Sequence, residues 1–211
     1  MKKESQVIFD KNVIEFVTVA AEFCAFLERA ESMKRSTFVD TTLKILPLLY
    51  LKASMLPKCE MIGDESPETY VTEEIYEVLR INLASILAEK DDYLEVFLPD
   101  MAYSDEPIKK NISEDLADTY QDIKDFIFVF QLGLNETMND SLAICQENFG
   151  LLWGQKLVNT MRALHDVKYS PKARGEDEEE EEYEPENNGD CHCEDDDCHC
   201  HDHGCHCHDD E

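Results

Sequence analysis

The stretch 113-SEDLADTYQDIKDFIFVF-130 decides the fold that this chain can adopt. Its large apolar residues recur every three or four positions, which is the spacing of one face of an α-helix. Ser113 is a typical helix N-cap residue, and Gly133 and Asn135 are typical of a helix end. The predicted helix therefore has one apolar stripe that must be covered by other helices; the stripe is Leu116, Tyr120, Ile123, Ile127, Phe130 and Leu134.

The same periodicity extends upstream of this stretch. A first helix carries Val13, Val17, Ala20, Cys24 and Leu27 on one stripe. A second helix is predicted to follow Ser36 or Thr37, and Pro47 should kink or split it. A third helix is predicted from the N-cap Thr72 to about Lys90, with acids in its first turn.

Between the third helix and the opening stretch, we expect a short helix at Tyr93–Leu98 and a loop from Pro99 to Asn111. Downstream, a long helical stretch is predicted from about Glu136 to Val167. Its apolar stripe changes face, so we expect a bend around Gly150 or Gly154. Because strand-like alternation is absent from the sequence, the predicted class is all-α: an up-and-down bundle of four or five main helices over residues 1–170.

Charge is distributed unevenly along the 211 residues, whose formal net charge is −29. Residues 176–211 carry 18 acids and no Lys or Arg, which leaves 30 acids and 19 bases, or −11, for the rest. Such a chain is a poor partner for nucleic acid or for an anionic membrane surface. It lacks an apolar run of the ~20 residues that a membrane-spanning helix needs. With no secretory signal pattern in the sequence either, we expect a cytoplasmic protein.

The C-terminal segment changes composition abruptly after Pro171. Residues 171–190 form a predicted acidic disordered linker, and residues 191–211 a Cys/His-rich tail, because neither has the apolar residues that a core requires. The tail consists of three heptads that each begin Cys-His-Cys, namely CHCEDDD, CHCHDHG and CHCHDDE. Its candidate metal ligands are Cys191, His192, Cys193, Cys198, His199, Cys200, His201, His203, Cys205, His206, Cys207 and His208.

Thiolate and imidazole donors together suit zinc and nickel best, with copper or cobalt as further options. A closed structural zinc finger fits less well, because the intervening residues are acids and glycine rather than a small apolar core. The competing interpretation is a repeat that adds charge and solubility and binds metal only incidentally. No cofactor is expected in the helical body.

A second constellation lies within the opening stretch. Asp118, Asp122 and Asp125 are spaced so that they share one helical face, and with Glu73, Glu74 and Glu77 they invite comparison with enzymes that hold magnesium on acidic helices. The helical angle places the three aspartates far from the apolar stripe, so we expect them to face solvent.

The remaining candidates have simpler interpretations. His165 should be a surface residue near a helix end, Cys24 and Cys145 buried small hydrophobes, and Trp153 part of the core. Cys59 should lie in a loop. Gln155, Asn159 and Arg162 are candidates for a pocket beside Trp153.

Five stretches together resemble a known family: NVIEFVTVAAEFCAFLE, LKILPLLYLKASMLP, EKDDYLEVFLPDM, ISEDLADTYQDIKDF and FGLLWGQKLVNTMRALH. In sequence, and in their order along the chain, they are similar to the bacterial domain of unknown function 5063, over about residues 7–169. The resemblance implies a small all-α cytoplasmic domain and no particular activity. The Cys/His tail is not part of the resemblance.

Three functional hypotheses remain. The first is a non-enzymatic protein that binds, buffers or delivers zinc, nickel or a similar ion through its tail, with the helical body as a docking domain for an unknown protein partner. The second is a helical interaction or regulatory module with an incidental tail. The third, a metal-dependent enzyme that uses the acidic helices, is the least favoured.

Overall fold

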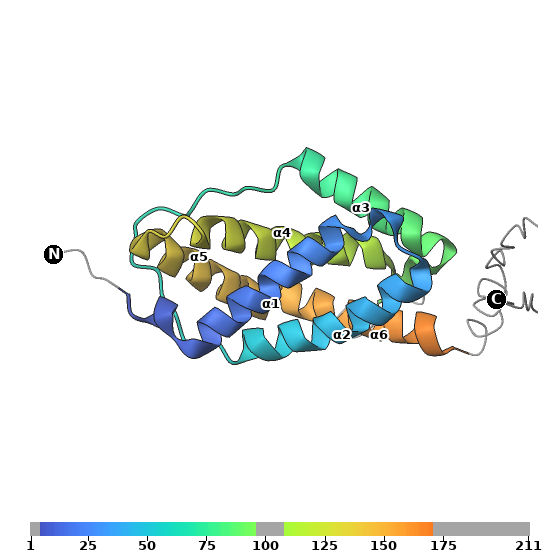
Figure 1. Ribbon diagram of the computed structural model, residues 1–211, viewed down its shortest axis with the longest axis horizontal. Coiled ribbons are helices and arrows are strands. Elements are labelled where there is room, and N and C mark those ends of the chain that lie inside the picture. Colours follow the sequence, from blue (N-terminus) through green and yellow to red (C-terminus); the bar gives the residue numbers. More distant parts are fainter. Residues whose placement is uncertain (1–4, 96–107, 171–211) are drawn as a thin grey trace, which may run out of the picture.

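Helix α4 (Ile112–Phe130), which contains the opening stretch, runs through the middle of the molecule (Figure 1). It packs against α1 (Lys11–Glu28), α3 (Glu73–Leu87), α5 (Asn135–Asn148) and α6 (Gly154–Tyr169). The computed structural model describes residues 5–95 and 108–170. The predicted linker 171–190 and tail 191–211 lie outside these residues.

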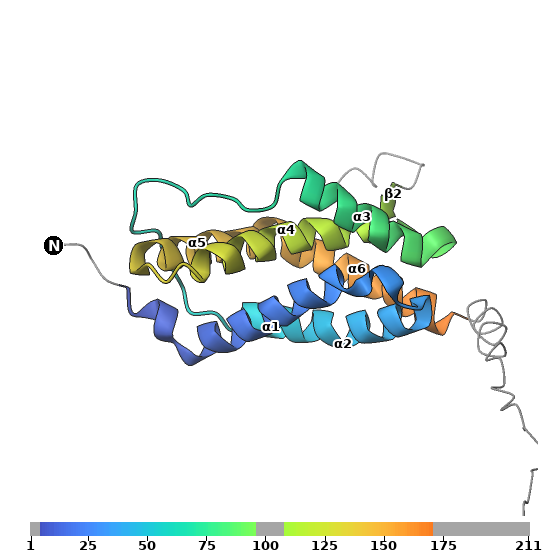
Figure 2. The same ribbon diagram turned by 45° about the horizontal axis from the view of Figure 1, so that its top comes forward.

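The remaining helix α2 (Arg35–Ser54) packs on α1 and α6. Successive helices from α1 to α5 run in alternating directions, and α6 continues in the direction of α5 (Figures 1 and 2). The described residues contain six α-helices, of which α5 and α6 are joined by a π-helical turn, η5 (Phe149–Trp153), into one continuous stretch. Short 3-10 turns lie at Val7–Phe9, Ala30–Ser32 and Ala88–Lys90. The prediction of an all-α up-and-down bundle is confirmed, and where a bend around Gly150 or Gly154 is predicted the structure has the π turn.

Trp153 is at the centre of the core and is fully buried, as predicted. Its ring stacks on Phe16 at a centroid distance of 6.5 Å and lies 4.7 Å from Phe149, while Phe16 lies 5.5 Å from Phe126. The indole Nε1 donates to the Cys145 carbonyl at 3.1 Å, so the polar atom is satisfied. This aromatic cluster joins α1, α4 and the α5–α6 stretch.

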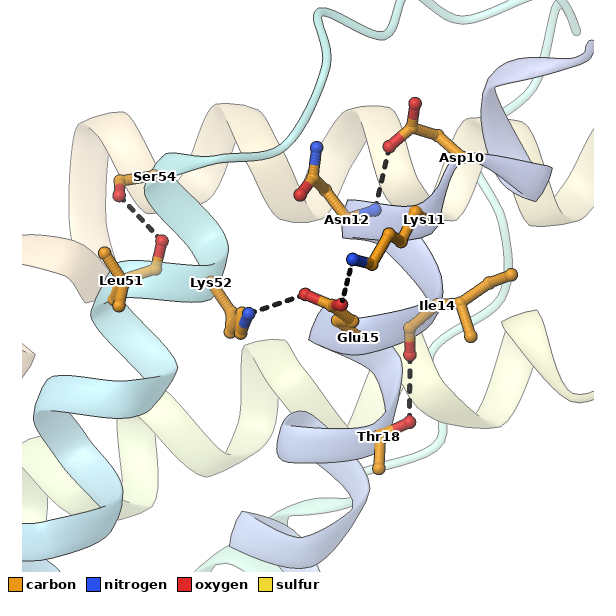
Figure 3. A network of polar contacts seen from close by, with 9 residues as sticks. All are labelled: Asp10, Lys11, Asn12, Ile14, Glu15, Thr18, Leu51, Lys52 and Ser54. Atoms are coloured by element: carbon orange, nitrogen blue, oxygen red, sulfur yellow. Dashed lines mark hydrogen bonds and ion pairs between the residues drawn. The ribbon is translucent and has the colours of Figure 1, made fainter.

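Polar contacts fasten the start of α1 to the end of α2 (Figure 3). The Asp10 side chain caps α1 by accepting from the Asn12 amide at 2.8 Å. Lys52 of α2 reaches Glu15 of α1 at 2.6 Å, and Lys11 lies 3.5 Å from the same carboxylate. The hydrogen bond from Lys52, aided by the charge of both lysines, lowers the pKa of Glu15.

The prediction for Pro47 is a kink or a split, and the split does not occur, because α2 continues through this residue. Pro47 removes one backbone hydrogen bond, but it is exposed, so water can satisfy the carbonyl that loses its partner. The predicted N-cap Thr72 of α3 is confirmed: its Oγ1 accepts from the Ile75 amide at 3.3 Å.

Two predictions around the start of α4 are wrong. Residues 92–94 form strand β1 (Asp92–Leu94), not a short helix, and β1 pairs antiparallel with β2 (Lys109–Asn111), where a loop was expected. Residues 96–98 of that expected helix lie outside the described residues. Ser113 is not the N-cap of α4, because the helix already begins at Ile112.

The carboxylate of Asp91 takes the role expected of Ser113. It accepts from the Ser113 amide and from the Ser113 hydroxyl, both at 2.7 Å. Asp91 is nearly buried, and it places a negative charge at the positive end of the α4 dipole. The β1–β2 pair brings Asp91 to this point, which explains why the chain is extended there.

The end of α4 also differs from prediction in one residue. Leu134 was expected on the buried stripe, but its side chain is 61% exposed, because α4 ends at Phe130 and Leu134 is the N-cap of α5. Gly133, with φ of 74°, makes the turn between the two helices. The other stripe residues are buried or packed against the core.

Candidate functional site: an acidic groove beside α4

Asp118, Asp122 and Asp125 do not face open solvent, contrary to prediction. All three are half-buried and line a hollow of about 350 Å³ between α4, the α5–α6 stretch and the segment before α3. The prediction failed because α4 packs against helices on several sides, so the face opposite its main stripe is also partly covered. The lining is Pro67, Glu68, Thr69, Asp118, Gln121, Asp122, Asp125, Phe126, Val129, Ser141, Ile144, Cys145, Asn148, Leu152 and Lys156.

Each of these aspartates has a different partner within the protein. Asp118 accepts from the Tyr76 hydroxyl at 2.8 Å and forms an ion pair with Lys156. Asp122 accepts from the side-chain amide of Asn148 at 2.6 Å. Asp118 and Asp122 therefore contact different helices, and their charges are spread along the hollow instead of meeting at one point.

Asp125 holds the segment that precedes α3. One of its oxygens accepts from the backbone amides of Tyr70 and Val71 at 2.7 and 2.8 Å. The Tyr70 ring then stacks on Phe128 of α4 at a centroid distance of 4.5 Å. These contacts fix the chain that forms one wall of the hollow.

Partial burial raises the pKa of Asp122, although the hydrogen bond from Asn148 opposes the shift. Burial likewise raises the pKa of Asp125 against the two backbone hydrogen bonds. Both carboxylates are thus less well solvated than in water, and a cation placed beside them would favour their charged forms.

A second hollow, of about 530 Å³, adjoins the first and shares Pro67, Glu68 and Val129 with it. It is lined by Asp64, Glu65, Ser66, Pro67, Glu68, Phe128, Val129, Leu132, Glu136, Thr137 and Asp140. Asp140, which is buried, accepts from the amides of Ile62 and Gly63 at 2.7 and 2.8 Å and so anchors the loop above it. We call the two hollows together the acidic groove.

The groove contains eight acids and a single base among its lining residues: Asp64, Glu65, Glu68, Asp118, Asp122, Asp125, Glu136 and Asp140 against Lys156. Sequence reasoning found only the three aspartates of α4. Asn148, Leu152 and Lys156 recur every four residues, and this spacing is a usable signal for the opposite wall. The loop acids are brought in by long-range contacts that have no local pattern.

The acids proposed as a magnesium site are not all brought together. Glu73 and Glu74 are exposed in the first turn of α3, and Glu77 forms an ion pair with Arg80 at 2.7 Å. Across residues 5–95 and 108–170, no three His, Cys, Asp or Glu side chains are arranged to hold a metal ion. Among the same residues, no helix combines the length and hydrophobicity of a transmembrane span.

The other candidate residues are placed as follows. Cys24 and Cys145 are buried, and burial raises the pKa of both thiols. His165 is exposed on α6, as predicted, with its ring 4.6 Å from that of Tyr169. Cys59 is half-buried in a loop, its sulfur 3.3 Å from the Asn139 side chain, and burial again raises the pKa.

The pocket suggested beside Trp153 is not formed as expected. Asn159 is buried and accepts from Gln155 at 3.1 Å, whereas Arg162 is exposed and donates to the Leu94 carbonyl at 3.0 Å. The twelve predicted metal ligands, from Cys191 to His208, lie outside the described residues.

Comparison with known proteins places the helical body in a family. The model of the domain of unknown function 5063 matches residues 7–170. The crystal structure of protein BF1032 from Bacteroides fragilis is 92% identical, with a TM-score of 0.73, and the match covers 80% of this chain and 99% of that one. No curated protein matches. The family match stops before the acidic linker and the tail, and the chain belongs to the family of the domain of unknown function 5063.

Proposed function

We propose that this chain is a non-enzymatic metal-handling protein of the bacterial cytoplasm. Its tail binds zinc, nickel or a similar ion, and its helical body is a docking domain for a protein partner. The observation that carries the proposal is the threefold repeat of Cys-His-Cys at residues 191–211, which provides six thiols and six imidazoles within one short segment. Reduced thiols of this kind are available in a cytoplasm, where disulfides are rare.

The number of ligands sets the expected capacity. Zinc prefers four ligands, so twelve donors hold at most about three ions. Thiols and imidazoles lose their protons when they coordinate, so binding releases protons and weakens as the pH falls. The acids between the Cys-His-Cys triplets raise the local concentration of cations but bind such metals more weakly than thiolates do.

The test is metal analysis of reduced, untagged protein that has been purified without a metal-affinity resin. Two comparison proteins are needed: a full-length variant with all six tail cysteines replaced by Ser, and a chain that ends at Tyr169. We expect about two or three bound ions in the parent, weaker binding through histidines in the Ser variant, and none in the shortened chain. Binding of less than one equivalent at micromolar zinc, nickel and cobalt would reject the metal-handling proposal.

The second candidate function is an interaction module whose tail is incidental. The acidic groove favours it, because a half-open, charged groove with apolar walls is a feature of binding surfaces. The two proposals differ in the tail alone, and a tail that binds less than one equivalent of metal would reject the first proposal and leave the second. The enzyme hypothesis is not carried forward, because the aspartates of α4 are each engaged by a different partner within the bundle.

A further inference from the structure

We propose that the acidic groove binds a basic, amphipathic peptide segment of a partner protein. This inference deepens the docking role given to the body under the proposed function. It rests on three properties of the described groove: its charge, its apolar edges and its length.

The charge of the groove selects a cationic ligand. Its lining has eight acids and one base, and that base, Lys156, is paired with Asp118. Hydrogen bonds from amides hold Asp122, Asp125 and Asp140 in place but do not cancel their negative charge. Because the carboxylates are spread along the groove, the ligand that fits carries several separate positive charges, as a Lys- or Arg-rich segment does.

The apolar edges select a peptide over a small polyamine. Leu132 is 57% exposed and Leu152 is 52% exposed, and each lines one of the two hollows. Phe128 of α4, also partly exposed, lines the same hollow as Leu132. Large apolar side chains beside acids suit a segment that alternates Lys or Arg with Leu, Ile or Phe, because burial of apolar surface then adds to the charge attraction.

The length of the groove suits more than one or two residues. It follows α4 from Asp118 to Val129, which at 1.5 Å per residue is about 16 Å. About three turns of a helix, or about five extended residues, span this distance. The aspartates on α4 line the first hollow, Asp64 and Glu65 line the second, and Glu68 lines both.

The probe for this proposal is a short fluorescein-labelled helical peptide made of Leu and Lys, titrated against full-length reduced protein in metal-free buffer. The groove variant carries Glu65→Gln, Glu68→Gln and Asp122→Asn. The matched control carries Glu22→Gln, Glu31→Gln and Asp166→Asn, three exposed acids outside the groove. Both variants have the same net charge and an unchanged tail, so non-specific attraction of the peptide to the tail cancels in the comparison.

We expect the groove variant to bind about tenfold more weakly than the control, since three ion pairs of ordinary strength add to roughly that factor. Replacing Leu132 and Leu152 by Ser should also weaken binding of the peptide, whereas Ile81→Ser, an exposed position on α3 outside the groove, should not. Equal affinities for the groove and control variants would overturn the proposal.

Titration with spermine distinguishes a peptide site from a polyamine site. One outcome is that spermine binds with the same dependence on the groove acids while replacement of Leu132 and Leu152 by Ser leaves peptide binding unchanged. In that case the groove binds a small polycation, and the peptide proposal is wrong. A metal titration on the same proteins keeps the two proposals apart: loss of peptide binding in the groove variant should leave the metal capacity of the tail intact, and a tail without metal affinity would not affect the peptide result.

Discussion

Replacement of Gly154 by alanine should destabilise the protein, although alanine is the better helix former. A Cβ atom at this position would lie 2.9 Å from the Phe149 ring and closer still to the Phe149 carbonyl oxygen. That oxygen accepts the i→i−5 hydrogen bond from the Gly154 amide that closes the π turn. Relief of the clash thus requires movement of the backbone bond that defines the turn.

The magnitude follows from two opposing effects. Helix propensity alone predicts that Gly→Ala stabilises by about 0.5–1 kcal/mol. Overpacking a filled site costs about 1–3 kcal/mol, and disturbing a hydrogen bond costs about 1 kcal/mol more. We expect Gly154→Ala to lower the free energy of unfolding by about 2 kcal/mol, which at an m-value near 2 kcal/mol per molar shifts the urea midpoint by about 1 M.

Gly150 is a matched control within the same π turn. It is exposed, and a Cβ atom there would have no atom within 4 Å, so Gly150→Ala should be neutral or stabilise by up to about 1 kcal/mol. Urea unfolding of the two variants, followed by circular dichroism, measures both effects. A Gly154→Ala variant as stable as the parent, or a Gly150→Ala variant equally destabilised, would refute the steric reasoning.

Three further predictions concern the core, a buried carboxyl group and the tail. Trp153→Ala should lower the free energy of unfolding by about 3–5 kcal/mol, measured by urea unfolding, because a fully buried aromatic is lost and a cavity remains. Burial raises the pKa of Asp115 to about 6, so its native form holds the proton more tightly than the unfolded chain does. As the pH rises from about 4 to 6, the free energy of unfolding of the parent should fall by on the order of 2 kcal/mol relative to that of Asp115→Asn. Urea unfolding of both proteins at the two pH values measures this, and a difference in stability that does not change with pH would contradict it. The metal affinity of the tail should fall steeply below pH ~6.5, the ordinary pKa of histidine. The variant with all six tail cysteines replaced by Ser should lose the thiolate absorption of bound cobalt.

Helical periodicity predicted the bundle because each helix buries at least one continuous stripe, and a stripe of apolar residues is visible in the sequence. The rule failed at Asp118, Asp122 and Asp125, because it assumes that the face opposite the stripe is free. Other helices cover α4 on several sides, and polar side chains that have hydrogen-bond partners within the protein can be partly buried there, as apolar ones are. A central helix can therefore bury acids that its own periodicity assigns to the surface.

The structure of the residues before α4 cannot be predicted from the local sequence pattern, for a different reason. Asp91 caps the helix from 22 residues before Ser113, and this distance is closed by a strand pair. Three-residue strands carry too little alternation to be recognised, and the apolar residues around Tyr93 therefore predict a short helix instead. The loop acids of the groove are also placed by contacts between distant parts of the sequence. Asp125 and Asp140 hold the backbone on either side of these acids through hydrogen bonds that span 54 to 78 residues.

The π turn explains why the sequence of the α5–α6 stretch shows two stripes instead of one. An extra residue in one turn rotates every later side chain relative to an uninterrupted α-helix. Leu142 and Cys145 then face the core from α5, while Leu157 and Leu164 face it from α6, which packs against α2. Leu152 of this turn lines one wall of the acidic groove together with Asn148 and Lys156. Gly154 is thus tied both to the packing of the bundle and to the shape of the groove, because the close approach of Phe149 that excludes a side chain is the approach that closes the turn.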